Sequence, residues 1–447
     1  MTPFTSIEER SSAPVREERG VLFDTMTLSA AAVLAKLAGA AKSVVIAKSF
    51  GSGAALDHYL LAFLAPSLLA DTFCGALVPV TVPRLIELEH REDRAASIAF
   101  YEQVLRRVLL YSALGTAGIA LIASAALWLI PAWRAIGMLA LSMLTILPLS
   151  AAANVWRAAL NSRRRFGIPA IAVVLTPAAI ILSVFSAGSG GSAWVLAVGT
   201  TIGAASELVL LGVAIRAEGF PLFPRAMQAA HKLDVFRREY AYLAVCAAVT
   251  GGSVLIGQAM AATLGIGSVS ILNYGTRLAG VLMAIGPAAL SVAVLPRFSE
   301  MAAEREWDTL RRSVARALAW ATLAAGAMAV LFILSSELFV RWTLERGAFT
   351  AADTSAVATV QAWSLVQMPF VVGIAILIRV LAALKMNRVL LPISAGALVA
   401  NLGLSYVLMK QLGVAGISLG ASLAQAAMFG AMAWIVFARR ELIEETC

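Results

Sequence analysis

The chain has 447 residues, of which 60% are hydrophobic and only 14% are charged. A soluble globular domain carries about 25% charged residues, so this composition excludes an ordinary soluble protein and favours an all-α membrane protein with many spans. The net charge of +9 would suggest a nucleic-acid partner in a soluble protein. In a membrane protein, basic loops that orient the helices explain it, and no nucleic-acid partner is expected.

Twelve apolar segments are long enough to cross the hydrocarbon of a bilayer, which takes about 20 helical residues. A polar tail over residues 1–25 precedes them and lacks the apolar stretch of a signal peptide. We expect six spans in an N-lobe over 26–214, a linker over 215–240, six spans in a C-lobe over 241–437, and a tail over 438–447. The predicted spans are 26–47, 58–82, 108–130, 136–156, 168–187, 193–214, 241–263, 270–295, 316–340, 356–378, 389–409 and 415–437.

Lysine and arginine are distributed unequally between the two sides that these spans define. One side, which includes both tails, holds 27 of the 35 basic residues, the other side holds 4, and the last 4 lie within spans. Because cytoplasmic loops carry the excess of basic residues, this asymmetry predicts a bacterial inner-membrane protein with both termini in the cytoplasm.

Three pairs of short segments resemble each other in the two halves of the chain. "VPRLIELEHRED" at 82–93 resembles "LPRFSEMAAERE" at 295–306, and "FGSGAALDHY" at 50–59 resembles "LGIGSVSILNY" at 264–274. The third pair is "RAALNSRRRFGIP" at 157–169 and "RVLAALKMNRVLLP" at 379–392. Three matches in the same order indicate a duplicated six-helix unit, with a pseudo-two-fold axis along the membrane normal and a central cavity between the lobes, as in transporters.

Four cations lie within or at the end of predicted spans, and an ionised group inside a span costs roughly 2.5–3.5 kcal/mol on insertion scales. Lys36, Lys42 and Lys48 follow one another along the first span, and Arg277 lies in the eighth. Lys48 can extend to the outer surface, whereas Lys36 and Arg277 are better explained by a water-filled cavity. A cavity lined by cations suits an anionic substrate such as a phosphate or pyrophosphate.

Three acidic residues accompany these cations. Asp57, at the start of the second span, is either a helix cap or the partner of a neighbouring cation. Asp71 and Glu207 lie within spans, where pairing with a cation is the expected explanation. Glycine and proline in spans two and eight, including Pro66, Pro79 and Gly275, indicate either broken helices beside a site or close helix packing.

Catalytic and cofactor motifs are not apparent in the sequence. There is no phosphate-binding loop of the G-x-x-x-x-G-K-[ST] type, and the three histidines and three cysteines are scattered without the spacing of a metal site. We therefore expect neither an enzyme nor a bound cofactor or metal.

Three stretches resemble the MurJ/MviN lipid II flippase family of the multidrug/oligosaccharidyl-lipid/polysaccharide exporter superfamily. They are "AKLAGAAKSVVIAKSFGSGAALDHYLLAFLAPSLL", "YGTRLAGVLMAIGPAALSVAVLPRFSE" and "ERGAFTAADT", and the resemblance runs from about residue 26 to 437 in a form shortened to about twelve helices. It implies two six-helix lobes that alternate between cytoplasmic and periplasmic openings. It also implies substrate-binding roles for Lys36, Lys42, Lys48, Asp57 and Arg277. The family's basic pair after the second-span proline is Ala70–Asp71 here, and its acid one turn after the helix-eight arginine is Gly280.

The resemblance and the cations together predict a flippase for a polyprenyl-pyrophosphate-linked saccharide, either lipid II or an exopolysaccharide or O-antigen unit. A coupling ion or the membrane potential would supply the energy. Two alternatives stay open at this point: a small-molecule antiporter of the multidrug-extrusion type, and a non-transporting scaffold of a glycan-synthesis complex.

Overall fold

The computed structural model describes residues 33–129, 134–188, 191–225, 234–283, 307–384, 386 and 389–438. Every regular element within these ranges is a helix, as predicted. Residues 33–50 form the first helix, and the others are α2 (Ala54–Leu69), η1 (Ala70–Cys74), α3 (Leu77–Arg91), α4 (Arg94–Leu129), α5 (Arg134–Met143), α6 (Ile146–Ser162), α7 (Gly167–Ala187), α8 (Ala193–Ala217), α9 (Asp234–Ala262), α10 (Ser268–Met283), α12 (Trp307–Leu334), α13 (Ser336–Leu344), α14 (Ala351–Leu365), α15 (Met368–Ala383), α16 (Leu390–Leu412) and α17 (Val414–Ala438).

Ten membrane-capable helices, some of them composed of two or three consecutive elements, lie in the described part of the chain. They confirm the predicted class of polytopic helical membrane protein. The spans expected over 26–47 and 270–295 lie partly outside the described residues, as do both tails, part of the 215–240 linker and the segment 295–306.

The second span is interrupted, as its prolines predict. A π-helical turn, η1, separates α2 from α3 and lies between Pro66 and Pro79. Proline has no N–H to donate and its ring crowds the preceding turn, so a local change of helical pitch is a common outcome. In the described part of the eighth span, α10 continues through Gly275 and Gly280 to Met283, and the remainder of that span lies outside the described residues. A Cβ at Gly275 would lie 2.5 Å from the Val360 side chain, so this glycine permits close packing of α10 on α14.

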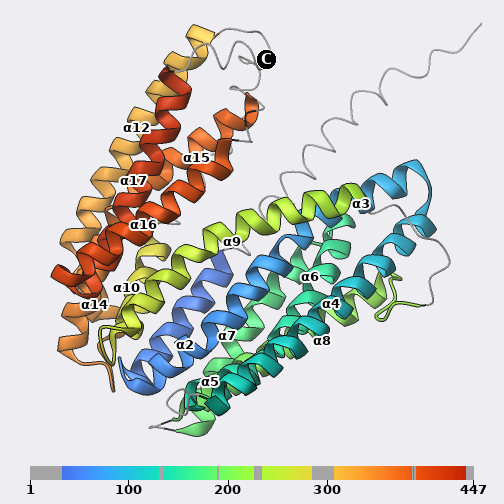
Figure 1. Ribbon diagram of the computed structural model, residues 1–447, viewed down its shortest axis with the longest axis horizontal. Helices are drawn as coiled ribbons and strands as arrows, with labels where there is room; N and C mark the ends of the chain where they lie inside the picture. Colours follow the sequence, from blue (N-terminus) through green and yellow to red (C-terminus); the bar gives the residue numbers. More distant parts are fainter. Residues whose placement is uncertain are drawn as a thin grey trace, which may run out of the picture.

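Buried side chains form one core shared by both halves of the chain and separate cores elsewhere. The shared core joins residues such as Ile46, Leu56 and Tyr59 to Leu272 and Val357. A second core lies within α3, α4, α6 and their neighbours, and a third lies mainly within α12, α15 and α17. Figure 1 shows the same arrangement: the lobes lie together near the starts of α2, α10 and α14, and α12, α15 and α17 diverge from α3, α4 and α6 at the other end. This confirms the predicted two-lobe architecture.

Candidate functional site

The two lobes meet at a contact that we call the closed end, formed by the loops at 51–53, 263–267 and 345–350 with the helix ends beside them. Asp57, in the first turn of α2, is its most buried charged residue, with 5% of its surface exposed. Its carboxylate accepts hydrogen bonds from the backbone N–H of Gly267 (2.5 Å) and Ser270 (2.7 Å) and from the Ser270 hydroxyl (2.5 Å). Asp57 therefore caps a helix, as one of the two expectations had it, but the helix is α10 of the opposite lobe.

This position is favourable because the first N–H groups of a helix have no partner within it and carry partial positive charge. The segments at 50–59 and 264–274, which resemble each other in sequence, lie against each other here. A Cβ at Gly267 would come within 2.8 Å of the Ser52 carbonyl oxygen, and Gly267 has a φ of +90°, so only glycine fits this approach. The hydroxyl of Tyr274 also donates to the Gly51 carbonyl at 3.2 Å.

The loop before α14 completes the closed end from the other side. The Ala348 N–H donates to the Lys48 carbonyl at 2.8 Å, and the Ser52 hydroxyl donates to the Asp353 carboxylate. Gly347, at a φ of +65°, has no room for a side chain, because a Cβ would lie 2.3 Å from the Lys48 carbonyl oxygen. The backbone of Lys48 is thus part of the lobe contact, while its side chain is exposed.

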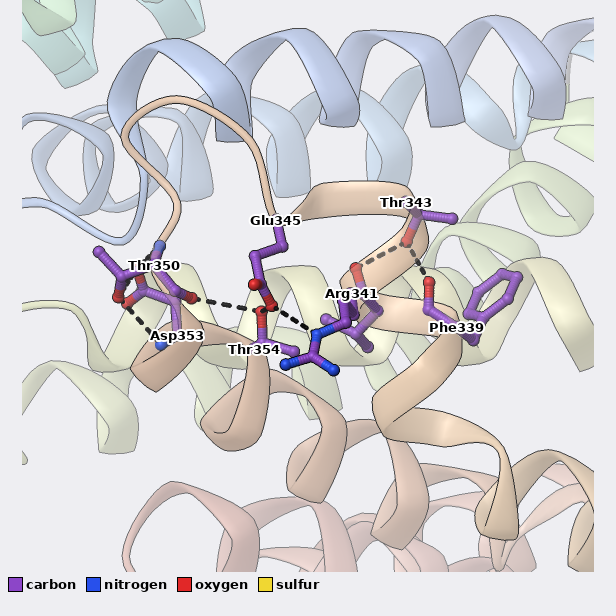
Figure 2. A network of polar contacts seen from close by, with 8 residues as sticks. Phe339, Arg341, Thr343, Glu345, Thr350, Asp353 and Thr354 are labelled. Carbon is purple, nitrogen blue, oxygen red and sulfur yellow. Dashed lines mark hydrogen bonds and ion pairs between the residues drawn. The ribbon is translucent and has the colours of Figure 1, made fainter.

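Local hydrogen bonds fix the shape of this loop, which belongs to the "ERGAFTAADT" segment. Thr350 and Asp353 form a capping box at the start of α14, with the Thr350 N–H donating to Asp353 at 2.8 Å. Figure 2 shows this pair next to Glu345, which accepts a hydrogen bond from the Thr354 hydroxyl at 2.8 Å and pairs with Arg341 at 3.5 Å. The segment therefore presents a pre-shaped surface to the loop at 51–53.

The four cations predicted within spans do not share one environment. Lys36, Lys48 and Arg277 are exposed, and Lys42 is half-buried. Arg277 lies on α10 of the C-lobe and Lys42 on the first helix of the N-lobe, and α10 packs against α2 at the lobe boundary. Among the described residues, neither Lys42 nor Arg277 has an ion-pair partner.

The two other acidic residues predicted within spans, Glu207 and Asp71, differ in their surroundings. Glu207 of α8 pairs with Arg157 of α6 inside the N-lobe, which confirms the pairing expected for it. Asp71 is exposed on η1, and the part of the chain that the structure describes contains no cation paired with it. The described residues also hold no cluster of three or more histidine, cysteine or acidic side chains that could bind a metal.

A cavity lies within the C-lobe and was not predicted from the sequence. It measures about 440 Å³ and is lined by α9, α10, α14, α15, α16 and α17. Thr276, the residue before Arg277 in α10, forms part of its wall. Its polar lining consists of hydroxyl and amide groups, and the hydroxyls of Ser364 and Ser418 have no hydrogen-bond partner among the described residues. The serine, asparagine and glutamine residues of otherwise apolar spans were the only sequence signal for it.

Comparison with known proteins places this architecture in a family. The model of the family "Lipid II flippase MurJ" matches residues 46–446. The Probable lipid II flippase MurJ of Rhizobium tropici is 24% identical over 425 residues, covering 89% of this chain and 78% of the relative. The Lipid II flippase MurJ of Burkholderia cenocepacia is 27% identical over 428 residues, covering 88% of this chain and 79% of the relative.

Solved structures agree on the fold. "Lipid II flippase MurJ, inward closed conformation" superposes with a TM-score of 0.73 at 18% identity, covering 92% of this chain and 87% of that one. An inward-facing multidrug resistance MATE transporter of the MOP superfamily gives the same TM-score at 13% identity, covering 92% of this chain and 96% of that one. The fold is thus shared by flippases and drug transporters, whereas the sequence match over most of the chain distinguishes between them: the chain belongs to the MurJ family of lipid II flippases.

Proposed function

We propose that this protein moves a polyprenyl-pyrophosphate-linked saccharide, of the lipid II or polysaccharide-unit type, from the cytoplasmic to the periplasmic leaflet. The observation that carries the proposal is a pair of cations, Lys42 on the first helix and Arg277 on α10 of the opposite lobe, without an ion-pair partner among the described residues. An anion placed between two cations of opposite lobes is attracted by both of them. A pyrophosphate, with two phosphoryl groups, is suited to bridge both.

The transport cycle that we propose uses alternating access. The excess of basic residues on the side of both tails supports a cytoplasmic position for them, which makes the closed end periplasmic and the membrane an inner membrane. In that orientation, the state in which this end is closed would receive substrate from the cytoplasm. Lys36 would meet the headgroup on entry, Lys42 and Arg277 would hold the pyrophosphate, and release would require the hydrogen bonds of Asp57 and the contacts beside Lys48 to open.

The test measures headgroup exposure on the periplasmic face in cells depleted of any redundant flippase, with membrane insertion checked by immunoblot. Lys42→Ala and Arg277→Ala should each abolish or strongly reduce exposure, because a charge-assisted hydrogen bond contributes about 1.5–3 kcal/mol, roughly tenfold to a hundredfold in affinity. Lys42→Arg should retain activity because the charge is kept. Lys48→Ala, on the same helix but at the closed end, where the contact uses its backbone and not its side chain, serves as the matched control and should be milder.

Normal exposure in both alanine variants would exclude the anionic site between the lobes. A drug antiporter with the same fold predicts a different pattern: no change in headgroup exposure, together with altered resistance to cationic drugs. A scaffold predicts that both variants remain active.

A further inference from the structure

A cavity larger than the one within the C-lobe lies away from the closed end, between the N-lobe and the start of α9. It measures about 920 Å³, within the range of small-molecule sites, and none of the five predicted substrate-binding residues lines it. Its walls come from α2, η1, α3, α4, α6 and α9. Three of its lining residues are arginines, Arg107 of α4 and Arg237 and Arg238 of α9.

Some of the basic residues near these arginines are held in ion pairs. Arg84 of α3, and Arg163 and Arg165 in the turn after α6, pair with Glu87, Glu89 and Glu218. No ion pair of Arg107, Arg237 or Arg238 occurs within the described ranges, and Arg237 and Arg238 are exposed while Arg107 is half-buried. Three guanidinium groups without an ion-pair partner among the described residues line one cavity, and guanidinium groups match the geometry of phosphate and carboxylate anions.

The rest of the cavity is apolar and extends into the membrane. Its wall on α4 runs from Arg107 at the predicted boundary of the hydrocarbon through Tyr111 and Gly115 to Ile119. Twelve residues of helix cover about 18 Å, which is close to the depth of one leaflet, about half of a 30 Å hydrocarbon layer. Gly115 contributes a notch, since a Cβ there would have no atom within 4 Å.

The start of α9 is held against the N-lobe at the mouth of this cavity. The Phe236 ring packs edge-on against Phe100 of α4 with centroids 5.6 Å apart, and the Tyr240 hydroxyl donates to the Phe73 carbonyl of η1 at 2.8 Å. Aromatic side chains beside cations at the hydrocarbon boundary are the usual surroundings of a lipid headgroup. A ligand in this cavity would contact the N-lobe and the first helix of the C-lobe at once.

We infer that this cavity binds an anionic phospholipid of the cytoplasmic leaflet. The phosphate lies among Arg107, Arg237 and Arg238, and one acyl chain follows α4 past Gly115 toward Ile119. The match between the apolar depth and a single leaflet favours a phospholipid over the longer prenyl chain of a lipid-linked saccharide. The bound lipid fastens α9 to the N-lobe and so stabilises the state in which the opposite end is closed.

The test is native mass spectrometry of the full chain in detergent, with phosphatidylglycerol or phosphatidylethanolamine of the same acyl chains added at equal concentration. Wild-type protein should retain phosphatidylglycerol preferentially. The triple variant R107Q/R237Q/R238Q should lose about tenfold in retained phosphatidylglycerol, because it removes the three charges that attract the phosphate. The matched control R106Q/R216Q/R316Q removes three exposed arginines from the same predicted side of the membrane, none lining the cavity, and should bind as wild type.

A second pair of variants tests the acyl-chain groove without changing charge. Gly115→Leu fills the notch and should reduce phosphatidylglycerol retention, whereas Gly118→Leu, on the same helix, equally free of neighbours and outside the cavity lining, should not. Equal retention of the two lipids by wild type, or unchanged phosphatidylglycerol retention in both R107Q/R237Q/R238Q and Gly115→Leu, would overturn the proposal. So would displacement of phosphatidylglycerol by added polyprenyl phosphate in wild type but not in Gly115→Leu, which would assign the groove to the substrate's tail. If the triple variant does not fold, the glycine pair decides.

Discussion

Asp57 connects the lobes through a single carboxylate that accepts three hydrogen bonds, two of them from the backbone at the start of α10. A carboxylate is acceptor-only, which suits a position that faces two N–H groups and a hydroxyl. Because Asp57 is buried, losing these hydrogen bonds would be costly: a buried donor left without an acceptor costs about 1–3 kcal/mol.

Asp57→Asn should therefore weaken the closed end while keeping side-chain volume. The amide places an NH₂ group where an acceptor is needed, so we expect a loss of about 1–3 kcal/mol in the contact between the lobes. The measurement is the rate at which a cysteine at Ser52 reacts with a thiol reagent, in a background where the native cysteines are serine. The rate should rise in Asp57→Asn.

Asp71→Asn is the matched control for this experiment. It makes the same chemical change within the second span, at an exposed carboxylate that has no hydrogen bond across the lobe boundary among the described residues. It should leave the Ser52 reaction rate unchanged. An equal rise in both variants would show that the carboxylate of Asp57 has no special part in the contact.

At the scale of elements, the loop that joins α13 to α14 acts as a rigid piece. The capping box of Thr350 and Asp353 and the bonds of Glu345 fix it internally, and the bonds from Ala348 and to Asp353 attach it to the opposite lobe. The sequence "ERGAFTAADT" thus specifies a shape that fits the turn at 48–52. Its glycine is required because the two backbones approach too closely for a Cβ.

Gly347→Ala should prevent this loop from seating. It incurs the cost of a positive φ, about 1 kcal/mol, and also a clash with the Lys48 carbonyl, which lies 2.3 Å from the added Cβ. We expect a markedly lower thermal unfolding temperature and a faster reaction of the thiol reagent with a cysteine placed at Ser52.

Gly413→Ala separates the two costs of this substitution. Gly413 has a φ of +57°, similar to that of Gly347, but nothing lies within 4 Å of its Cβ position. It should therefore show the smaller effect, from backbone strain alone. Equal effects of the two substitutions would mean that the clash with Lys48 is relieved without disturbing the loop.

At the scale of the whole molecule, transport by the proposed cycle requires the closed end to open. The shared core and the loop contacts occur at this end, and the other ends of the lobes have cores of their own. Each lobe is thus stabilised independently of the contact, as two bodies that rock about each other must be.

A disulfide across the closed end should stop transport reversibly. Ser52→Cys with Asp353→Cys, in a background without the native cysteines, replaces a side-chain contact between the lobes by a covalent bond. Headgroup exposure should cease on oxidation and return on reduction. Each single cysteine variant loses the same hydrogen bond, and the Asp353 variant also loses the capping box of α14. Neither single variant can form the disulfide, so transport by both should change little on oxidation. Undiminished transport by the oxidised double variant would mean that this end does not open.

The class of fold could be predicted from the residues alone. Apolar segments of about 20 residues have to be helices in a bilayer, since every backbone polar group needs a partner within its own segment. The excess of basic residues on one side gave the predicted orientation, and the resemblance of short segments gave the two-lobe duplication. The pairing of Glu207 with a cation could be expected because an isolated charge within a span is costly, although the sequence did not identify Arg157.

Contacts between residues of different spans could be read from the folded arrangement but not from the sequence. The sequence placed Lys42 and Arg277 within spans but could not show that α10, which carries Arg277, packs against α2 of the other lobe, since that depends on how the lobes pack. It offered a cap for Asp57 without revealing that the capped helix belongs to the other lobe. Helical periodicity is a local property that a chain encodes within a few turns, whereas a contact between spans some 200 residues apart depends on the packing of every helix between them.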